Sequence, residues 1–320
     1  MTGTMRAFGL ADEASSAGFL ELPVPEPSPG ELRIRVRASS VNGYDAYVAS
    51  GMARGMMEHR YPVVIGKDHA GVVDALGEGV TGWTVGDEVT GIGPPQTHLD
   101  ARGTYAEYLV VPDAGFLERK PANLTFEQAA SLGLAALSGL VTMDVTAPAE
   151  GSVVLIVGAT GGVGSYAVQL AAVTGATVVA TGLPEDDAWI RGLGASEVVD
   201  YTGDVAAAVR DRHPDGVDAL IVAVHVGDGF GALAELVKDG GSVASMVGGA
   251  DVEALATRNV TATNVYAQAD PSRFTAVVQL AADGGLRVPI THTVTFDELP
   301  EALGLVGKRR SRGKVAVTIA

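Results

Sequence analysis

The chain has 320 residues, with 22 Lys or Arg against 38 Asp or Glu and a formal net charge of −16. This length accommodates two domains with separate cores, and the negative field disfavours nucleic-acid binding. Cysteine is absent, which excludes disulfides, thiolate zinc sites, iron–sulfur clusters and a cysteine nucleophile. Neither a signal or transit pattern nor a bilayer-length apolar run stands out, so we expect a soluble, cytoplasmic protein without a membrane partner.

The first third of the chain predicts an all-β module, because short β-branched or alternating runs are separated by Gly and Pro. The proline-rich stretch 23–30 predicts an extended surface turn, since no helix accommodates that spacing of prolines. The strands expected here are Met5–Leu10, Phe19–Val24, Glu31–Ser40, Gly71–Leu76, Glu88–Gly91 and Thr104–Val110.

From Leu124 the apolar spacing becomes helical, and Thr125 with Gln128 has the spacing of a capping box. The stretch Val153–Gly182 then combines an apolar strand, a glycine-rich turn, a helical pattern and a second β-branched run. This is the β-turn-α-β unit of a dinucleotide-binding fold.

Three glycines of this turn have separate physical roles. Gly161 and Gly162 let the backbone turn tightly and approach a pyrophosphate, and Gly164 lets the helix pack closely on the first strand. The amides at the helix N-terminus would receive the anion.

Strands and helices alternate after this unit, which predicts a parallel, doubly wound sheet. The expected strands are Glu197–Tyr201, Val217–His225, Gly241–Val247 and Asn259–Gln268; the expected helices are Ala188–Leu193, Val205–Arg212, Phe230–Lys238 and Pro271–Ala282. The chain then returns to β-runs at His292–Phe296 and Lys314–Ile319 around a helix at Leu299–Val306. We expect these runs to complete the first module, giving domains of residues 1–122 with 285–320, and 123–284.

Several motifs are spread along nearly the whole chain: VNGYDAYVASG (Val41–Gly51), YPVVIGKDHAGVV (Tyr61–Val73), GDEV (Gly86–Val89), GTYAEYLVV (Gly103–Val111), VLIVGATGGVGSYAVQLA (154–171) and RGKVAV (Arg312–Val317). Together these motifs resemble the medium-chain dehydrogenase/reductase superfamily, and within it the zinc-independent quinone oxidoreductase (zeta-crystallin-like) branch. The resemblance implies an α/β fold with a GroES-like β-module and a Rossmann doubly wound parallel sheet.

The chain departs from the zinc-dependent branch of that superfamily at the metal ligands. Asn42, Lys67 with Asp68, and roughly Leu134 stand where the resemblance places Cys, His-Glu and a further ligand. An ammonium and a leucine do not ligate zinc, so we expect no metal. No histidine pair has the spacing of a helical zinc site, although His225 ends the predicted strand Val217–His225, at the edge where such folds bind ligands.

The resemblance implies hydride transfer from a nicotinamide cofactor to a quinone or to the activated C=C of an α,β-unsaturated carbonyl. Two alternatives stay open: an enoyl reductase acting on polyketide or fatty-acyl intermediates, and a non-catalytic NADPH-binding protein. A carrier-protein partner would require a basic patch, for which Arg309, Arg310 and Arg312 are the candidates. The strand expected within Asn259–Gln268 could pair with a second copy in a homodimer.

Asn42 and Tyr47 are the candidate catalytic residues, because amide and phenol donors can stabilise an oxyanion where no metal does so. Tyr47 could instead be a packing aromatic. Asp45 and Asp68 are expected to be structural anchors, and Lys67 to be a paired charge of little energetic weight. The methionines at 52, 56 and 57 either suit an adaptable apolar pocket or only pack their loop.

The resemblance and the Rossmann geometry place the cofactor against residues from several segments. We favour NADPH over NADH because Gly182 ends the second strand where an NAD-specific fold carries an acid, although residues 185–187 are acidic. Arg312, Lys314 or Arg191 could supply cations for the 2′-phosphate. The expected cofactor-binding residues are Ser138, Thr142, Ala159, Thr160, Gly161, Gly162, Val163, Gly164, Thr181, Gly182, Tyr201, Val224, His225, Met246, Val247, Arg312 and Lys314.

Overall fold

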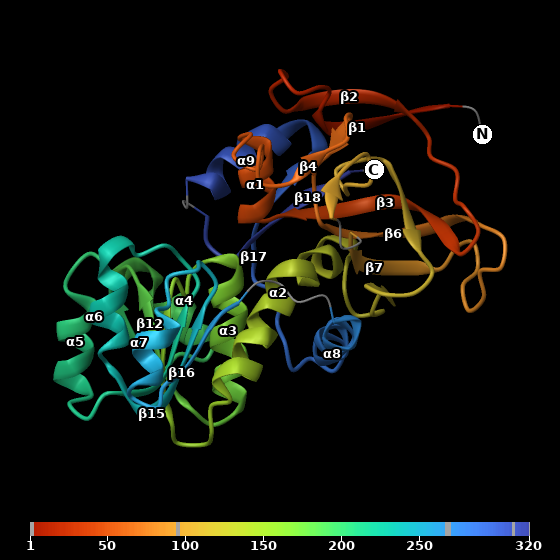
Figure 1. The fold of residues 1–320 in the computed structure, drawn as a ribbon. Helices are drawn as coiled ribbons and strands as arrows, with labels where there is room; N and C mark the ends of the chain where they lie inside the picture. The colour runs from red at the N-terminus through yellow and green to blue at the C-terminus, as the bar shows by residue number, and fades with distance from the viewer. Residues whose placement is uncertain (1–2, 94–96, 266–269, 309–310, 320) are drawn as a thin grey trace. The chain divides into compact units, whose positions relative to one another are not determined.

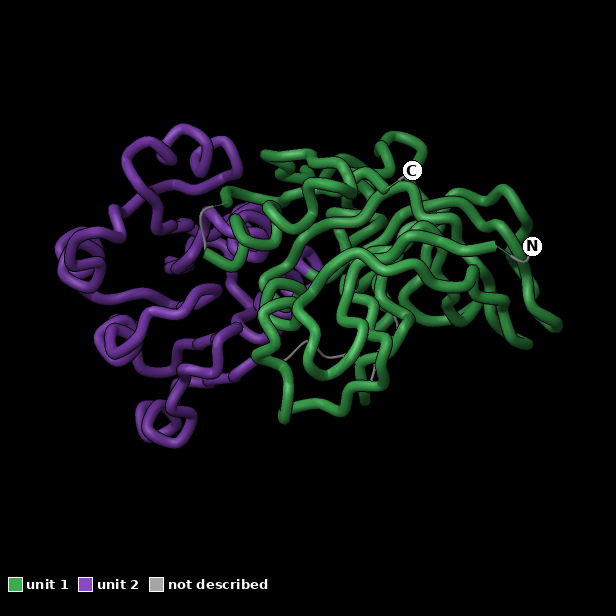
Figure 2. The backbone as a smooth tube through the Cα atoms, turned by 90° about the horizontal axis from the view of Figure 1, so that it is seen from above, with its two compact units in different colours: residues 1–134, 269–320 green, residues 135–268 purple. Residues whose placement is uncertain are grey.

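The computed structural model describes residues 3–93, 97–265, 270–308 and 311–319 (Figure 1). The chain divides into two compact units, residues 1–134 with 269–320 and residues 135–268 (Figure 2). These boundaries lie at 134/135 and 268/269 rather than at the expected 122/123 and 284/285. The first part of helix α2 (Phe126–Thr146) and helix α8 (Pro271–Ala282) therefore belong to unit 1.

Unit 1 is built from β-sheets. One sheet has the order β2-β1-β5, a larger one has the order β10-β7-β6-β3-β18-β17 with β9 also on β3, and β4 pairs with β8. The strands are β1 Thr4–Leu10, β2 Gly18–Pro23, β3 Glu31–Val41, β4 Glu58–His59, β5 Val63–Val64, β6 Asp68–Leu76, β7 Glu88–Ile92, β8 His98–Leu99, β9 Tyr108–Pro112, β10 Leu117–Arg119, β17 Ile290–Thr295 and β18 Lys314–Thr318. Its other helices are α1 Gly43–Ala49 and α9 Leu299–Gly307, the latter preceded by the 3₁₀ turn Phe296–Glu298.

The end of the chain completes the first module, as the sequence predicts. Strand β18 pairs antiparallel with β3, with Val315 opposite Val41, and β17 lies parallel to β18 on its other side. Two expectations differ in detail: the strand predicted at Thr104–Val110 is β9, shifted toward the C-terminus, and α1 was not predicted. The pairing of β18 with β3 brings Lys314 beside residues from the first quarter of the chain.

Unit 2 contains a parallel sheet of order β13-β12-β11-β14-β15-β16, the strand order of a dinucleotide-binding Rossmann fold. Its strands are β11 Val153–Val157, β12 Thr177–Gly182, β13 Glu197–Asp200, β14 Val217–Val222, β15 Val237–Ser245 and β16 Thr261–Asn264. Its helices are α3 Gly162–Val173, α4 Asp187–Gly192, α5 Val205–Arg212, α6 Phe230–Ala234 and α7 Val252–Ala256, with 3₁₀ turns at Pro184–Asp186 and Gly227–Gly229. The described part of the predicted strand Asn259–Gln268 holds β16, and residues 266–268 lie outside the described residues.

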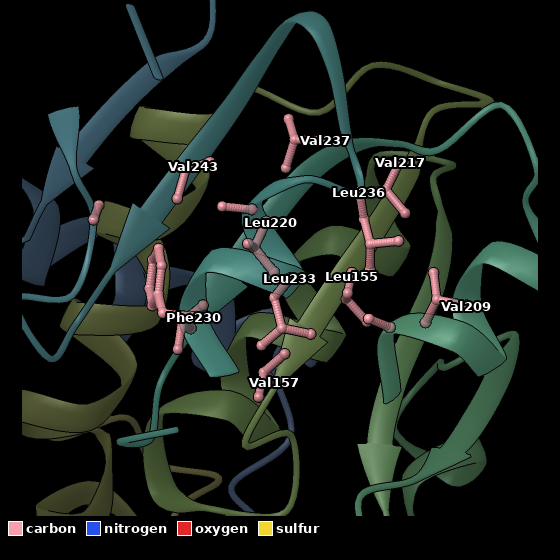
Figure 3. Packing of buried hydrophobic residues seen from close by; sticks show 14 of the residues in the cluster. Leu155, Val157, Val209, Val217, Leu220, Phe230, Leu233, Leu236, Val237 and Val243 are labelled. Atoms are coloured by element: carbon pink, nitrogen blue, oxygen red, sulfur yellow. The ribbon is translucent and has the colours of Figure 1, made fainter. Parts of the chain in front are cut away.

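The core of unit 2 lies between one face of this sheet and helices α5, α6 and α7. Figure 3 shows Leu155 and Leu220 from the sheet beside Leu233 and Phe230 of α6. Because successive strand residues point to opposite faces, Leu155 faces this cluster while Ile156, also fully buried, faces the other side. The strands are thus covered on both faces, as their continuous apolar runs predict.

Helix α2 begins with the predicted capping box: the Thr125 amide donates to Gln128 Oε1 (3.0 Å) and the Gln128 amide to Thr125 Oγ1 (3.2 Å). The helix is kinked at Gly133, whose φ of −27° and ψ of −120° are not helical. It is long and apolar enough to cross a membrane, although no apolar run of bilayer length stands out in the sequence, and 78% of its most apolar window is buried. Such burial is typical of the core helix of a globular protein.

Candidate active site

Helix α1 carries the candidate catalytic segment, and Asn42 is its N-cap residue. The Asn42 backbone amide donates to Asp45 Oδ2 at 2.9 Å, the return half of a capping box. Tyr105 also donates its hydroxyl to Asp45 Oδ2, at 3.0 Å. Asp45 is fully buried, so its carboxylate fixes the start of α1 from inside the module.

A buried polar network lies next to this helix start. Asp68 Oδ2 accepts from Ser40 Oγ (2.6 Å), Asn42 Nδ2 (2.8 Å) and Lys314 Nζ (3.4 Å). The Lys314 ammonium also donates to Asn42 Oδ1 (2.7 Å) and to the Val41 carbonyl (3.3 Å). Lys314 is only 1% exposed and Asp68 is fully buried. One ammonium thus joins β18 to β3, β6 and the start of α1.

This network changes the roles of two residues predicted from the sequence. The Asn42 side-chain amide donates to Asp45 and Asp68 and its oxygen accepts from Lys314, so its hydrogen-bonding groups are engaged within the protein. The structure therefore gives Asn42 an anchoring role instead of the predicted oxyanion contact. Lys314 is enclosed in unit 1 and does not present its ammonium to a cofactor phosphate, contrary to the expectation. Asp45 and Asp68 are structural anchors, as expected.

Burial sets the protonation of this network. Burial first, and then the charge of Asp68, raise the pKa of Asp45 to about 6, while hydrogen bonds from Asn42 and Tyr105 and the charge of Lys314 lower it. The pKa of Lys314 is lowered by burial and held up by the two carboxylates. The Lys314 ammonium and the Asp45 carboxylate therefore each favour the charged form of the other.

Asp68 also fixes the kink of α2. Its Oδ1 accepts the Leu134 backbone amide at 2.7 Å, directly after the non-helical Gly133. A Cβ on Gly133 would lie 2.1 Å from that same oxygen. The residue at 133 must therefore be glycine for the carboxylate to reach the amide.

His69 is the next residue along β6 and is fully buried. Neither ring nitrogen has a hydrogen-bond partner among the residues that the structure describes. Burial lowers the pKa of His69 to about 4, against the opposing charge of Asp68. His69 is therefore neutral at physiological pH.

The second candidate, Tyr47, lies on the exposed side of α1. Its hydroxyl donates to Met56 Sδ at 2.7 Å, and the Tyr44 hydroxyl lies 4.0 Å from Met57 Sδ. Residues three apart share a helix face, so the two tyrosines and the methionine loop form one partly exposed aromatic and thioether surface. Met56 is 77% exposed, which leaves this surface open to an apolar ligand.

Lys67 precedes Asp68 in the chain but does not make the ion pair of that carboxylate. The Asp68 ion pair is made with Lys314 at 3.4 Å, and the Lys67 Nζ lies 5.7 Å from the ring centroid of Tyr44. Burial lowers the pKa of Lys67, while the charges of Asp45, Asp100 and Asp68 raise it. A partly desolvated cation therefore borders the aromatic surface of α1.

In unit 2 the glycine turn fits a pyrophosphate. Helix α3 begins after Gly161 with no side-chain cap, so its first amides are available to an anion. The expected close approach at Gly164 is confirmed, because a Cβ there would lie 2.1 Å from the Gly158 carbonyl oxygen. Gly158 itself has a φ of +86°, which favours glycine. These residues can hold the dinucleotide that the fold implies.

The other expected cofactor residues of unit 2 differ in accessibility. Thr142 is fully buried and donates to the Gly139 carbonyl, and Thr181 is 2% exposed and accepts from the Gly158 amide at 3.0 Å. These two positions shape the backbone. Ser138, Ala159 and Gly182 are also buried; Thr160, Gly161, Gly162, Val163, Val224, Met246 and Val247 are half-buried; Tyr201 and His225 are exposed. Arg312, in unit 1, is exposed, and Arg309 and Arg310 lie outside the described residues.

The acidic run after β12 is largely engaged within the protein. Asp186 is 4% exposed and its Oδ2 accepts the Leu183 amide at 3.1 Å. Asp187 pairs with Arg191 at 2.9 Å, and the Arg191 guanidinium also donates to the Ser196 carbonyl. The Arg191 guanidinium is thus engaged by Asp187 of its own helix and by the Ser196 carbonyl beyond it.

The side chains that could ligate a metal bear on the prediction that the chain has no metal site. Among the residues described by the structure, no cluster of three or more His, Cys, Asp or Glu could hold a metal ion. At the positions of the lost ligands, Asn42 Oδ1 and Asp68 Oδ2 bind the Lys314 ammonium. The oxygen donors there already serve a cation that belongs to the chain.

Comparison with known proteins places this geometry in a family. The alcohol dehydrogenase GroES-like domain family matches residues 28–121, and the zinc-binding dehydrogenase family matches residues 193–317. A zinc-type alcohol dehydrogenase-like protein of Staphylococcus epidermidis is 31% identical over 275 residues, covering 82% of this chain and 79% of the relative. The trans-enoyl reductase tazE of Aspergillus terreus is 36% identical over 209 residues, covering 60% and 68%.

Among solved structures, the quinone oxidoreductase from Coxiella burnetii has a TM-score of 0.87 and 27% identity, and the match covers 99% of this chain and 100% of that one. The family implies an oxidoreductase that uses a nicotinamide cofactor, which the uncapped start of α3 fits. The chain therefore belongs to the medium-chain dehydrogenase/reductase superfamily, in its quinone oxidoreductase branch.

Proposed function

We propose that this protein is an NADPH-dependent reductase of quinones or of the activated C=C of α,β-unsaturated carbonyls, working without a metal. The observation that carries the proposal is the buried network in which Lys314 occupies the oxygen donors of Asn42 and Asp68. A cation of the chain fills the coordination that a metal would need. The charge that develops on a substrate oxygen must then be met by protein donors.

The bound cofactor supplies the hydride, and the chain's residues position and stabilise the reacting groups. The α3 amides bind the pyrophosphate, and Gly164 allows the helix to lie close to β11. Tyr47 presents a phenol on the open face of α1, where it can leave Met56 and donate to the acceptor oxygen. Apolar acceptors suit the aromatic and thioether surface there.

NADPH is the proposed cofactor because Gly182 offers no acid to repel a 2′-phosphate at the end of β12. Asp186 is buried as a turn cap and Asp187 is neutralised by Arg191, which weakens the repulsion expected from the acidic run. A Glu185→Lys variant should raise kcat/KM for NADPH relative to NADH. Glu253→Lys makes the same charge change on α7 and should not. A wild-type preference for NADH would contradict the assignment.

The direct test is to mix purified protein and NADPH with a set of quinones and enones and to follow loss of NADPH. Tyr47→Phe should lower kcat by about 10²-fold and leave the Kd of NADPH unchanged. Stoichiometric zinc whose removal abolishes activity would contradict the metal-free mechanism. Absence of NADPH oxidation with every acceptor, despite NADPH binding, would instead favour a non-catalytic binding protein.

A second candidate is an enoyl reductase acting on polyketide or fatty-acyl intermediates, favoured by the similarity to a trans-enoyl reductase. Acyl thioester enoyl substrates should then give a higher kcat/KM than free enones and quinones. We also propose a cytoplasmic homodimer that pairs through β16, which is the edge strand of the unit 2 sheet. Light scattering on a size-exclusion column would report a monomer mass if the dimer assignment is wrong.

A further inference from the structure

Lys67 has an environment that an ordinary surface lysine lacks. Its side chain is partly buried at the start of β6, and its Nζ lies 5.7 Å from the Tyr44 ring centroid. The Tyr44 hydroxyl borders Met57 Sδ, at 4.0 Å. An ammonium that loses water beside aromatic and sulfur atoms gains more from a nearby anion than one in bulk solvent.

The neighbouring carboxylates favour the charged form of Lys67 and leave its ammonium able to donate to a ligand. Asp68 gives its ion pair to Lys314, and Asp45 Oδ2 accepts from Asn42 and Tyr105. Their charges oppose the effect of burial on Lys67. An ammonium carries three N–H donors, so it can keep protein contacts and still donate to a ligand.

Lys67 and Lys314, the two lysines near Asp68, therefore differ in how accessible their ammonium groups are to a ligand. Lys314 is 1% exposed and is enclosed by protein oxygens, whereas Lys67 is half-buried beside the open face of α1 that carries Tyr44 and Tyr47. We propose that the Lys67 ammonium stabilises the oxyanion that forms on the acceptor during reduction, with Tyr44 positioning it. This inference rests on the proposed reductase function and names the group that meets the developing charge.

An enone is one class of acceptor for this step. The acceptor gains a hydride at its β-carbon from the reduced nicotinamide, which is oxidised, and the electron pair of its C=C bond moves toward the carbonyl oxygen as an enolate. The ammonium of Lys67 hydrogen-bonds this oxygen and offsets its charge. A proton from solvent then completes the saturated ketone. For a quinone the same ammonium would meet the hydroquinone oxyanion.

The absence of cysteine from the chain permits a sharp test. In Lys67→Cys the introduced thiol is the only one, so 2-bromoethylamine restores an ammonium at nearly the original distance and iodoacetamide gives a neutral side chain instead. Lys308→Cys, at an exposed site at the end of α9, is the matched control. We expect Lys67→Cys to lose about 10²-fold in kcat, aminoethylation to recover most of it, and carbamidomethylation to recover none.

A second readout needs neither turnover nor cofactor. 4-Nitrophenol is a phenol whose anion absorbs visible light, and its pKa when bound should fall in the wild type and in aminoethylated Lys67→Cys. This fall in the pKa of 4-nitrophenol should be absent in carbamidomethylated Lys67→Cys, and in Lys308→Cys it should be as large as in the wild type. A Lys67→Met variant that keeps kcat within about threefold of an active wild type would overturn the inference. A wild type that reduces no acceptor but lowers the nitrophenol pKa through Lys67 would overturn the proposed reductase function while leaving the anion site.

Discussion

Asp45 in helix α1 and His69 in strand β6 are both buried in unit 1, and they should make the free energy of unfolding depend on pH in opposite directions. The pKa of Asp45 is raised from 3.8 to about 6. The native state therefore binds this proton more tightly, and Asp45 stabilises the fold below pH 3.8 and loses that contribution as pH rises through about 6. The pKa of His69 is lowered from 6.5 to about 4, so its contribution is full above 6.5 and is lost as pH falls through about 4.

Each difference between native and unfolded pKa is worth about 3 kcal/mol over its full window. Between about pH 7 and about pH 4.5, each group changes the free energy of unfolding by about 2 kcal/mol, in opposite directions. The two contributions therefore nearly cancel in the wild type. Asp45→Asn should make the protein lose about 2 kcal/mol on acidification, and His69→Leu should make it gain about the same amount.

The assay is urea unfolding at several pH values, followed by tryptophan fluorescence. Trp83 lies in unit 1 and Trp189 in unit 2, so a Trp189→Phe background reports on unit 1 alone. The change of the free energy of unfolding with pH is compared between variants, which removes the pH-independent cost of each substitution. Equal slopes in Asp45→Asn and His69→Leu would refute the assignment of these two protonation states.

Three further substitutions test the packing around the two sites. Lys314→Met should destabilise unit 1 by about 3–5 kcal/mol in urea unfolding, because it leaves the Asp68 carboxylate buried without its cation. Adding Asp68→Asn to that variant should recover part of the lost stability. Gly133→Ala should lower the unfolding midpoint by displacing Asp68 from its helix contact, with Gly285→Ala as a control where the nearest atom to a new Cβ is 3.4 Å away. Gly164→Ala should weaken NADPH binding in calorimetry, since its Cβ would displace the backbone at the start of α3; unchanged affinity would argue against that cradle.

The Rossmann unit could be predicted from sequence because its signals are local. The strand before the glycine turn, the helix after it and the second strand all lie within Val153–Gly182, and β11, α3 and β12 occupy that stretch. Helix α1 has a local signal that was missed: Asn42 and Asp45 have the spacing of a capping box, with Asp in place of Glu. A search that admitted Asx pairs would have found the helix start.

The buried network could not be predicted in the same way, because it is made by pairing between distant strands. Lys314 reaches Asp68, 246 residues earlier in the chain, only because β18 lies against β3. Sequence reasoning recognised that β18 returns to the first module, yet it assigned Lys314 to the cofactor. Burial decides the role of a lysine, and burial at this position depends on the register in which Val315 faces Val41.

The same register explains why Lys67 and Lys314, which both lie near Asp68, have different roles. Lys314 sits where four elements meet, so its ammonium is consumed in holding Asn42 and Asp68 in place. Asp68 makes its ion pair with Lys314, and the Nζ of Lys67 lies 5.7 Å from the ring centroid of Tyr44. The region around Asp68 thus holds one fully buried structural cation, Lys314, and one more accessible cation, Lys67. Exchanging the buried cation should change mainly stability, and exchanging the accessible one should change mainly kcat.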